Sequence, residues 1–228
     1  LHAVVGEKCL LDAPRQEQVA LTELLHDEGL LRHGTRPLPG RHQLDNAACA
    51  LAALDLAGAR GLTVGEEAVR EGLCAVRWPG RLELVSQRPD VWLDGAHNLQ
   101  AAEALAAHLM TVSRRRGTLA QGRLLLVVGM MRDKDRKGVV ALLAAIPGAS
   151  HLIVTSAAHP RATDPRDLAR DSEGLGVPVA VRATVAEAFA YARSLAGPDD
   201  TICVTGSLLV VGVTKAALEG TTVSGLRG

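Results

Sequence analysis

Aromatic side chains are scarce in this sequence, since Trp, Tyr and Phe together make up 2% of its 228 residues. An excess of one charge is also missing, because 25 Lys and Arg stand against 25 Asp and Glu. A nucleic-acid-binding protein normally carries a basic face, and one that binds single strands adds rings that stack on bases. The composition therefore argues against a nucleic-acid partner.

Long apolar runs and clustered cysteines are missing as well. No apolar stretch reaches the roughly 18 residues of a membrane span, and no charged segment followed by an apolar one marks a signal peptide. The four cysteines lie far apart, without a Cys-x-x-Cys spacing, at Cys9, Cys49, Cys74 and Cys203. This pattern favours free thiols in a reducing compartment over a zinc site or a disulfide framework. We therefore expect a cytoplasmic protein with no membrane partner.

The chain divides into a helical first part and an alternating second part. Helical periodicity occupies three segments of the first part, 15–32, 46–56 and 63–76. Thr63 and Glu66 have the spacing of a capping box at the start of the third segment. The sequence RWPGR (77–81) then forms a rigid joint that contains proline. We place the domain boundary between residues 76 and 77.

After this joint, short apolar runs alternate with helical patterns. We expect strands at 82–86, 91–93, 124–128, 152–155, 177–181 and 202–205. We expect helices at 99–116, 136–146, 165–171, 184–196 and 207–219. Thr184 and Glu187 have the spacing of a capping box. Because the central runs are apolar on both faces, the pattern predicts an α/β fold with a doubly wound, mostly parallel six-stranded sheet.

Polar residues gather where predicted strands give way to helices. Asp94 and His97 follow the strand at 91–93. Lys134 follows the strand at 124–128, and Ser207 follows the strand at 202–205. The carboxyl ends of parallel strands share one edge of a sheet, so we expect these side chains to converge there. Together with a helix N-terminus, they suit a small zwitterion or a phosphorylated ligand.

Each of these side chains also has a structural explanation. Ser207 suits a helix N-cap, and Asp94 suits a turn before Gly95. His97 suits a surface position without a partner. Spacing alone therefore predicts a ligand site in an α/β protein and does not say which ligand binds.

Five segments carry a more specific signal: GRHQLDNAACALAAL (40–54), RWPGRLE (77–83), LDGAHN (93–98), GMMRDKD (129–135) and TGSLLVVG (205–212). In this order they resemble the folylpolyglutamate synthase/dihydrofolate synthase family of the Mur ligase superfamily. The resemblance implies that residues 77–228 form the Rossmann-like Mur ligase C-terminal domain. It also implies that residues 1–76 are the helical end of the central ATP-binding domain.

The resemblance implies an ATP-dependent acid–amino-acid ligase that joins L-glutamate to a folate, with dihydropteroate as a second candidate acceptor. The acceptor carboxylate becomes an acyl phosphate, which the amino group of glutamate then attacks. ATP and Mg2+ are the implied cofactors. Folate or dihydropteroate and L-glutamate are the implied partners, and we expect a monomer.

The motifs also imply a role for each candidate residue. Asn46 would contact adenine, Arg81 the phosphates and Asp94 the ribose or another part of the nucleotide. The planar fork of arginine suits phosphate, and a carboxylate accepts hydrogen bonds from hydroxyls. Without the motifs, Asn46 would be interpreted as a helix N-cap and Arg81 as an exposed strand residue.

The implied catalytic residues are His97, Lys134 and Ser207. In this family, the positions of His97 and Ser207 lie at the glutamate site. Lys134 is a candidate partner for a carboxylate or a phosphate. The structural alternatives for His97 and Ser207 are those given above.

A Gly-x-x-x-x-Gly-Lys-Ser/Thr loop, which would cradle the phosphates of ATP, is absent from residues 1–228. The metal ligands of the family are expected upstream, so none is assigned here. Because the sequence begins at Leu1, we expect a piece of a longer protein that is inactive by itself. A non-catalytic module that binds nucleotide or glutamate, and a Mur-type peptide ligase fragment, are the alternatives.

Overall fold

The structure of the chain, a computed structural model, describes residues 42–116 and 122–220. It divides into two units, Leu1–Trp78 and Pro79–Gly228. The boundary therefore falls two residues after the position expected from the sequence, inside the joint at 77–81. The helix expected at 15–32 lies outside the described residues.

The described part of the first unit contains two helices, α2 (His42–Gly58) and α3 (Glu66–Ala75). Their facing side chains form a small apolar cluster of Ala48, Leu51, Val69 and Leu73. The capping box expected from Thr63 and Glu66 is wrong, because α3 begins after Gly65 and makes no side-chain cap. Glu66 is instead the first residue of the helix, where its negative charge favours the helix N-terminus.

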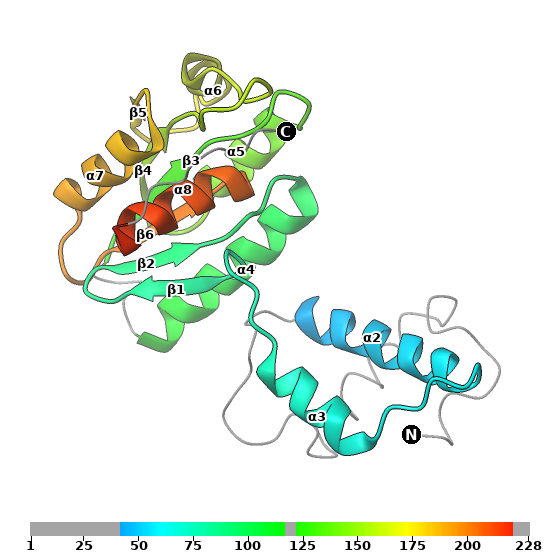
Figure 1. Ribbon diagram of the computed structural model, residues 1–228. Helices are drawn as coiled ribbons and strands as arrows, with labels where there is room; N and C mark the ends of the chain where they lie inside the picture. The colour runs from blue at the N-terminus through cyan, green and yellow to red at the C-terminus, as the bar shows by residue number, and fades with distance from the viewer. Residues whose placement is uncertain (1–41, 117–121, 221–228) are drawn as a thin grey trace. The chain divides into compact units, whose positions relative to one another are not determined.

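The second unit is built on a six-stranded sheet with the order β1-β2-β6-β3-β4-β5 (Figure 1). The strands are β1 (Glu83–Ser86), β2 (Asp90–Leu93), β3 (Leu124–Val128), β4 (Ala149–Val154), β5 (Val179–Val181) and β6 (Thr201–Thr205). β1 pairs with β2 in the antiparallel direction, and the other four pairings are parallel. The sheet predicted from the sequence is confirmed in its fold class.

Five helices cover the two faces of this sheet (Figure 1). They are α4 (Leu99–Arg116), α5 (Arg136–Ala144), α6 (Pro165–Asp171), α7 (Val185–Leu195) and α8 (Leu208–Glu219). Side chains of α4, α5 and α6 pack on one face, against residues such as Leu126 and Cys203. Side chains of α7 and α8 pack on the other face, against Val127 and Val204. β3 is buried throughout because it is apolar at every position.

The helix starts in this unit follow local sequence signals. Thr184 caps α7 as expected, since its hydroxyl accepts the N–H of Glu187 at 3.2 Å. The Glu187 carboxylate returns the contact by accepting the N–H of Thr184 at 3.2 Å, which completes the capping box. Asp135 caps α5 by accepting the N–H of Gly138 at 3.1 Å. These caps define where the loops at the sheet edge end.

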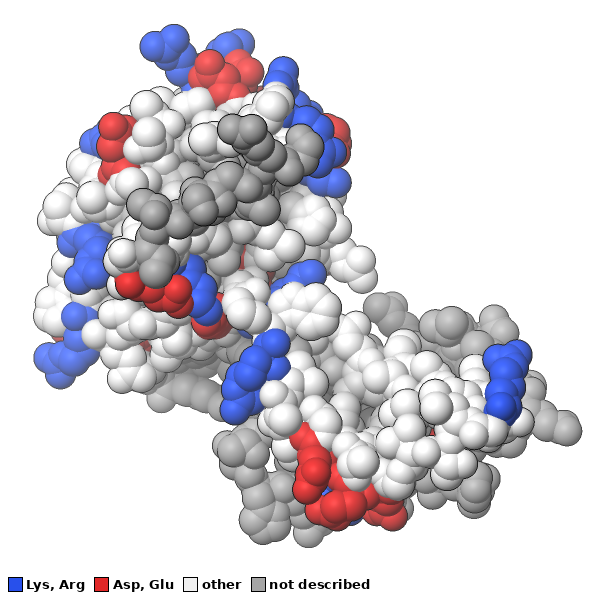
Figure 2. Space-filling model, in the orientation of Figure 1, with Lys and Arg blue, Asp and Glu red and all other residues white. Residues whose placement is uncertain are grey.

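Charged side chains of both signs are mixed on the surface. On the face shown in Figure 2, Lys and Arg lie among Asp and Glu. Ion pairs contribute to this mixing, such as Arg70 with Glu66 at 3.1 Å on α3. Within residues 42–116 and 122–220, no helix is both long enough and apolar enough to cross a membrane.

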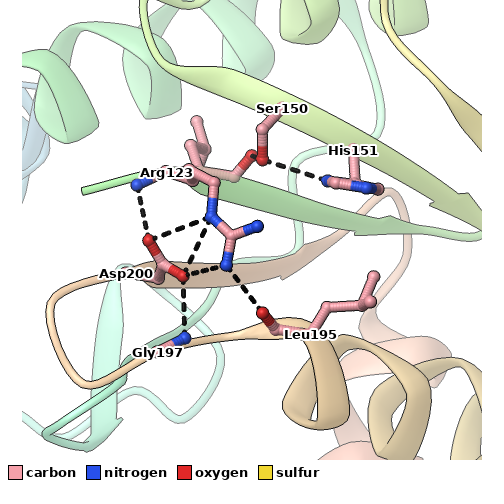
Figure 3. A network of polar contacts seen from close by, with 7 residues as sticks. Arg123, Ser150, His151, Leu195, Gly197 and Asp200 are labelled. Carbon is pink, nitrogen blue, oxygen red and sulfur yellow. Dashed lines mark hydrogen bonds and ion pairs between the residues drawn. The ribbon is translucent and has the colours of Figure 1, made fainter. Parts of the chain in front are cut away.

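A polar cluster holds the amino edge of the sheet, where β3 and β6 begin (Figure 3). The Asp200 carboxylate accepts the backbone N–H groups of Arg123 at 2.7 Å and Gly197 at 2.8 Å. The Arg123 guanidinium donates to the same carboxylate at 2.7 Å and to the Leu195 carbonyl at 2.7 Å. Burial alone would raise the pKa of Asp200, but these donors and the charge of Arg123 hold this pKa below its usual value.

We expect Asp200→Asn to lower the free energy of unfolding by about 1–3 kcal/mol near neutral pH, because buried donors lose an ionised acceptor. A carboxyl whose pKa is lowered by folding stabilises the protein above its unfolded pKa, and this stabilisation is lost as pH falls through the folded pKa. The difference between wild type and variant should therefore shrink below about pH 4. Urea unfolding of both proteins across this range is the measurement. An equal difference at every pH would contradict an ionic role for Asp200.

Candidate functional site

The candidate site lies at the carboxyl edge of the sheet, where β2, β6, β3 and β4 are neighbours in that order. The loop after β2 carries Asp94 and His97. The loops after β6 and β3 carry Ser207 and Lys134. The structure therefore brings these four residues to one edge, while their roles stay predictions.

Hydrogen bonds join the loops that carry these residues. The Asp94 N–H donates to the Val204 carbonyl at 3.0 Å, and the Gly129 N–H donates to the Thr205 carbonyl at 3.2 Å. The Thr205 hydroxyl donates to the Ala96 carbonyl at 3.4 Å. The end of β6 thus connects the loop after β2 with the loop after β3.

Two glycines allow these loops to approach closely. Gly206 has a φ of +98°, and a Cβ at this position would lie 2.7 Å from the Gly129 carbonyl oxygen. A Cβ on Gly95 would lie 2.5 Å from Cδ2 of Leu208, the first residue of α8. A larger residue at Gly206 would collide with backbone, whereas one at Gly95 would displace the side chain of Leu208. The first turn of α8 is therefore packed directly against the loop after β2.

Asp94 is buried, and its carboxylate accepts two backbone hydrogen bonds. Oδ1 accepts the N–H of Ala96 at 2.8 Å, which closes the turn before His97. Oδ2 accepts the N–H of Leu82 at 2.9 Å, ahead of β1. The turn-forming alternative for Asp94 is therefore confirmed. The ribose contact of Asp94 stays a prediction.

Arg81 stands on a turn in which both neighbours have an unusual backbone conformation. Gly80 has a φ of +74° and Leu82 has a φ of +46°. The Gly80 N–H donates to Oε2 of Glu83 at 2.8 Å, and the Gly80 carbonyl accepts the N–H of Gly95 at 2.8 Å. Arg81 itself is half-buried and precedes β1. It is therefore not the exposed strand residue of the structural alternative.

His97 and Ser207 each use one polar atom in the protein. Nδ1 of His97 lies 2.9 Å from the Gly95 carbonyl, which can only accept, so Nδ1 carries the proton and Nε2 of a neutral ring is an acceptor. Ser207 is the N-cap of α8, because its hydroxyl accepts the N–H of Leu209 at 3.1 Å. The N-cap alternative is therefore confirmed for Ser207. A hydroxyl that accepts one bond still has its own proton to donate.

Lys134 and Asn46 lie in more open surroundings. Nζ of Lys134 is 3.4 Å from Oδ2 of Asp133, and their side chains are 35% and 54% exposed. Asn46 is inside α2, so the N-cap interpretation is wrong for it. Its amide donates to Oε1 of Gln43 at 2.9 Å. Asn46 belongs to the first unit, whereas the other five candidates belong to the second. Its adenine contact stays a prediction.

The thiol of Cys203 lies close to this edge but does not add a nucleophile. Burial raises the pKa of Cys203, and the negative charge of Asp94 raises it further. Since the thiolate is the reactive form of cysteine, the protonated thiol is a packing group. It is part of the core on the α4 side of the sheet.

Glu83 and Lys215 were not singled out from the sequence, although they shape the site. Nζ of Lys215, on α8, lies 2.5 Å from Oε1 of Glu83, while Oε2 accepts the Gly80 N–H. Glu83 belongs to the RWPGRLE segment, so a signal for it was present. Lys215 is 132 residues away from Glu83 in the sequence, and no local pattern pointed to it.

A scan of family models matches residues 80–208 to the Mur ligase, glutamate ligase domain. The match runs from Gly80 to Leu208. It therefore includes every candidate residue except Asn46. The same range contains β1 to β6 and the five helix N-termini that follow the joint.

Named relatives agree with this match. The chain is 32% identical to the dihydrofolate synthase/folylpolyglutamate synthase of Bacillus subtilis over 183 residues, 80% of its length. It is similar to E. coli FolC in complex with DHPP and ADP, with a TM-score of 0.67 and 33% identity over 81% of the chain. It is also similar to a bifunctional folylpolyglutamate synthase/dihydrofolate synthase with Mn, AMPPNP and L-glutamate bound, with a TM-score of 0.62 and 30% identity over 80% of the chain.

The chain spans only part of these proteins, namely 40% of the B. subtilis relative, 40% of the E. coli chain and 41% of the third. The family match, by contrast, covers more than half of the present chain. Five candidate residues and the whole carboxyl edge of the sheet fall inside it. The chain therefore belongs to the family of Mur ligase glutamate ligase domains.

Proposed function

We propose that this chain is part of an ATP-dependent ligase that joins L-glutamate to the terminal carboxylate of a folate or of dihydropteroate through an acyl phosphate. The observation that carries the proposal is the carboxyl edge, where hydrogen bonds join the turn of Arg81 to the His97 loop and the N-terminus of α8 packs against that loop. The B. subtilis relative and the E. coli structure support the folate branch. They do not favour a non-catalytic module or a Mur-type peptide ligase.

In this proposal, Arg81 and Asp94 of the second unit hold the nucleotide, and the adenine contact of Asn46 is a separate proposal for the first unit. The guanidinium of Arg81 binds phosphate oxygens with two parallel hydrogen bonds. It neutralises charge on the phosphate that is transferred. Asp94 accepts a ribose hydroxyl while keeping its backbone bonds, and Asn46 contacts adenine. The complexes of related proteins with ADP and AMPPNP support nucleotide binding in this family.

His97, Lys134 and Ser207 hold glutamate and assist its attack. Lys134 pairs with a carboxylate of glutamate, and the hydroxyl proton of Ser207 is donated to the same substrate. The N-terminus of α8 favours negative charge beside Ser207. Glutamate must attack with a neutral amine, and Nε2 of His97 is an acceptor for the proton that this amine loses. The related structure with L-glutamate bound supports a glutamate site in this family.

Mg2+ enters the proposal as the ion that neutralises the phosphates of ATP. In the described parts of the chain, no group of three or more His, Cys, Asp or Glu side chains is arranged to hold a metal ion. We therefore assign no metal ligand to these residues and derive no step through the ion.

We also propose a cytoplasmic location and a monomeric state. The exposed, free thiols of Cys49 and Cys74 support a reducing compartment. Size-exclusion chromatography with light scattering checks the monomer. A stable dimer at micromolar concentration would contradict it.

The 228 residues alone are expected to show no ligase activity, because their sequence contains no Gly-x-x-x-x-Gly-Lys-Ser/Thr loop. Without backbone donors around the phosphates, phosphoryl transfer loses its main electrostatic stabilisation. The assay supplies ATP, Mg2+, a folate and labelled glutamate to the purified chain, with the complete protein encoded with these residues as the positive control. ATP-dependent transfer of glutamate by the 228 residues alone would refute the expectation. Failure of the complete protein to add glutamate to either acceptor would refute the proposed function.

Replacing Arg81 with Ala in the complete protein should lower kcat/KM for ATP by about 10²–10³, since a charge-assisted contact to the transferred phosphate is lost. Arg81→Lys should recover only part of the rate, because lysine keeps the charge and lacks the planar fork. Steady-state kinetics with ATP and folate varied separately is the measurement, and the KM for folate should change much less. Turnover of Arg81→Ala at the wild-type rate would show that Arg81 does not contact the nucleotide.

A further inference from the structure

Glu83 uses both oxygens of its carboxylate to join two separate parts of the second unit. Oε2 accepts the backbone N–H of Gly80 at 2.8 Å. Oε1 lies 2.5 Å from Nζ of Lys215 on α8, and the two side chains are about one quarter exposed. The carboxylate therefore links the turn that presents Arg81 to the middle of a helix.

The turn of Arg81 depends on such contacts because it is outside regular structure. Its neighbours, Gly80 and Leu82, both have positive φ, a conformation that is unfavourable for leucine. Three backbone groups beside Arg81 are held: the Gly80 N–H by Glu83, the Gly80 carbonyl by Gly95 and the Leu82 N–H by Asp94. Removing the acceptor on Glu83 would release one of these three.

The same helix connects this turn with the candidate glutamate site. Ser207, Val211 and Lys215 are spaced by four residues, which places them along one side of α8. A Cβ on Gly80 would lie 2.7 Å from Cγ1 of Val211, so this side of α8 packs against the turn. Ser207 at the cap, Val211 against Gly80 and Lys215 on Glu83 thus follow one another along the helix.

We propose that Glu83 is a positioning residue for Arg81. Its acceptor for the Gly80 N–H fixes the backbone that carries Arg81, and its ion pair with Lys215 fixes that backbone to the helix capped by Ser207. The inference rests on the proposed function, because it assumes that Arg81 acts on the nucleotide. Small displacements of a reacting or binding group reduce the rate strongly, so a loosened turn should slow the reaction without removing any side chain that contacts substrate.

The two contacts of Glu83 do not contribute equally. A partly exposed ion pair is screened by water and is usually weak. The hydrogen bond from the Gly80 N–H to Glu83, by contrast, holds a residue that has no side chain to make a contact of its own. We therefore assign the positioning effect mainly to the Gly80 bond and the smaller, stabilising effect to the pair with Lys215.

Four variants of the complete protein separate these contacts. Glu83→Ala removes both, Glu83→Gln keeps an acceptor for Gly80, and Lys215→Met removes only the ion pair. The double variant Glu83→Lys/Lys215→Glu restores opposite charges but places an ammonium group, which cannot accept a hydrogen bond, beside the Gly80 N–H. Each variant is measured for kcat and KM with ATP and glutamate varied separately, and for thermal unfolding.

We expect Glu83→Ala to lower kcat/KM for ATP by about tenfold to a hundredfold. Glu83→Gln and Lys215→Met should stay within about threefold of wild type. The double variant should recover thermal stability and still use ATP as poorly as Glu83→Ala. Arg123→Gln is the matched control, since it breaks an ion pair at the amino edge of the sheet. It should lower thermal stability and leave kcat/KM for ATP unchanged.

Two results would overturn the inference. One is a Glu83→Ala variant that is less stable but keeps the wild-type kcat/KM for ATP. The other is a Glu83→Lys/Lys215→Glu double variant whose kcat/KM for ATP returns to the wild-type value. If Glu83→Ala does not fold, the double variant alone decides. Two further measurements separate this failure from that of the proposed function. Normal ATP use in Arg81→Ala would reject the role of Arg81, and an unmodified complete protein that adds no glutamate would reject the function itself. A defect in Arg81→Ala that Glu83→Ala does not share would reject only the role of Glu83.

Discussion

One buried carboxylate, that of Asp94, holds together the segments on which the candidate site depends. It accepts the Leu82 N–H ahead of β1 and the Ala96 N–H ahead of α4. A buried N–H without an acceptor is costly, and neither segment is part of a strand that could supply one. Arg81 directly precedes Leu82 in the sequence, and His97 directly follows Ala96. A ligand contact and a structural role are therefore not alternatives for Asp94, and substitution of Asp94 would disturb both together.

The two edges of the sheet use polar groups differently. At the amino edge, Asp200 and Arg123 are engaged with each other and with surrounding backbone groups, so the cluster is closed upon itself. At the carboxyl edge, Ser207 and His97 each use one polar function in the protein and keep another, a hydroxyl proton and a ring nitrogen. Parallel strands direct their following loops to this edge, which is where ligands of such sheets bind. The closed cluster contributes stability, and the open one keeps the groups that the proposed function assigns to substrate.

The sequence predicted most accurately those elements whose character is local. β3 and α6 have the expected bounds, because β3 is apolar at every position and α6 begins with proline at 165, directly after the capping residue Asp164. β5 was expected at 177–181 and is shorter, Val179–Val181, since Pro178 has no N–H to donate to a neighbouring strand. The cap expected at Thr63 is wrong because two residues of extended backbone follow it before α3 begins. Topology rules then placed four candidate residues at one edge, without naming the ligand.

The pair of Glu83 and Lys215 shows what such reasoning misses and why. Glu83 lies in the RWPGRLE segment, but no pattern links it to Lys215, and their contact exists only because the sheet order places α8 beside the turn of Arg81. The close packing of this helix also depends on glycine at position 80, where φ is positive and a Cβ would collide with Val211, and it is helped by glycine at position 95, where a Cβ would displace the side chain of Leu208. These glycines, Glu83 and Asp94 fix the backbone around Arg81 before any ligand arrives. A substrate that binds such a frame does not have to supply the cost of ordering it, and more of its binding energy is available for the reaction.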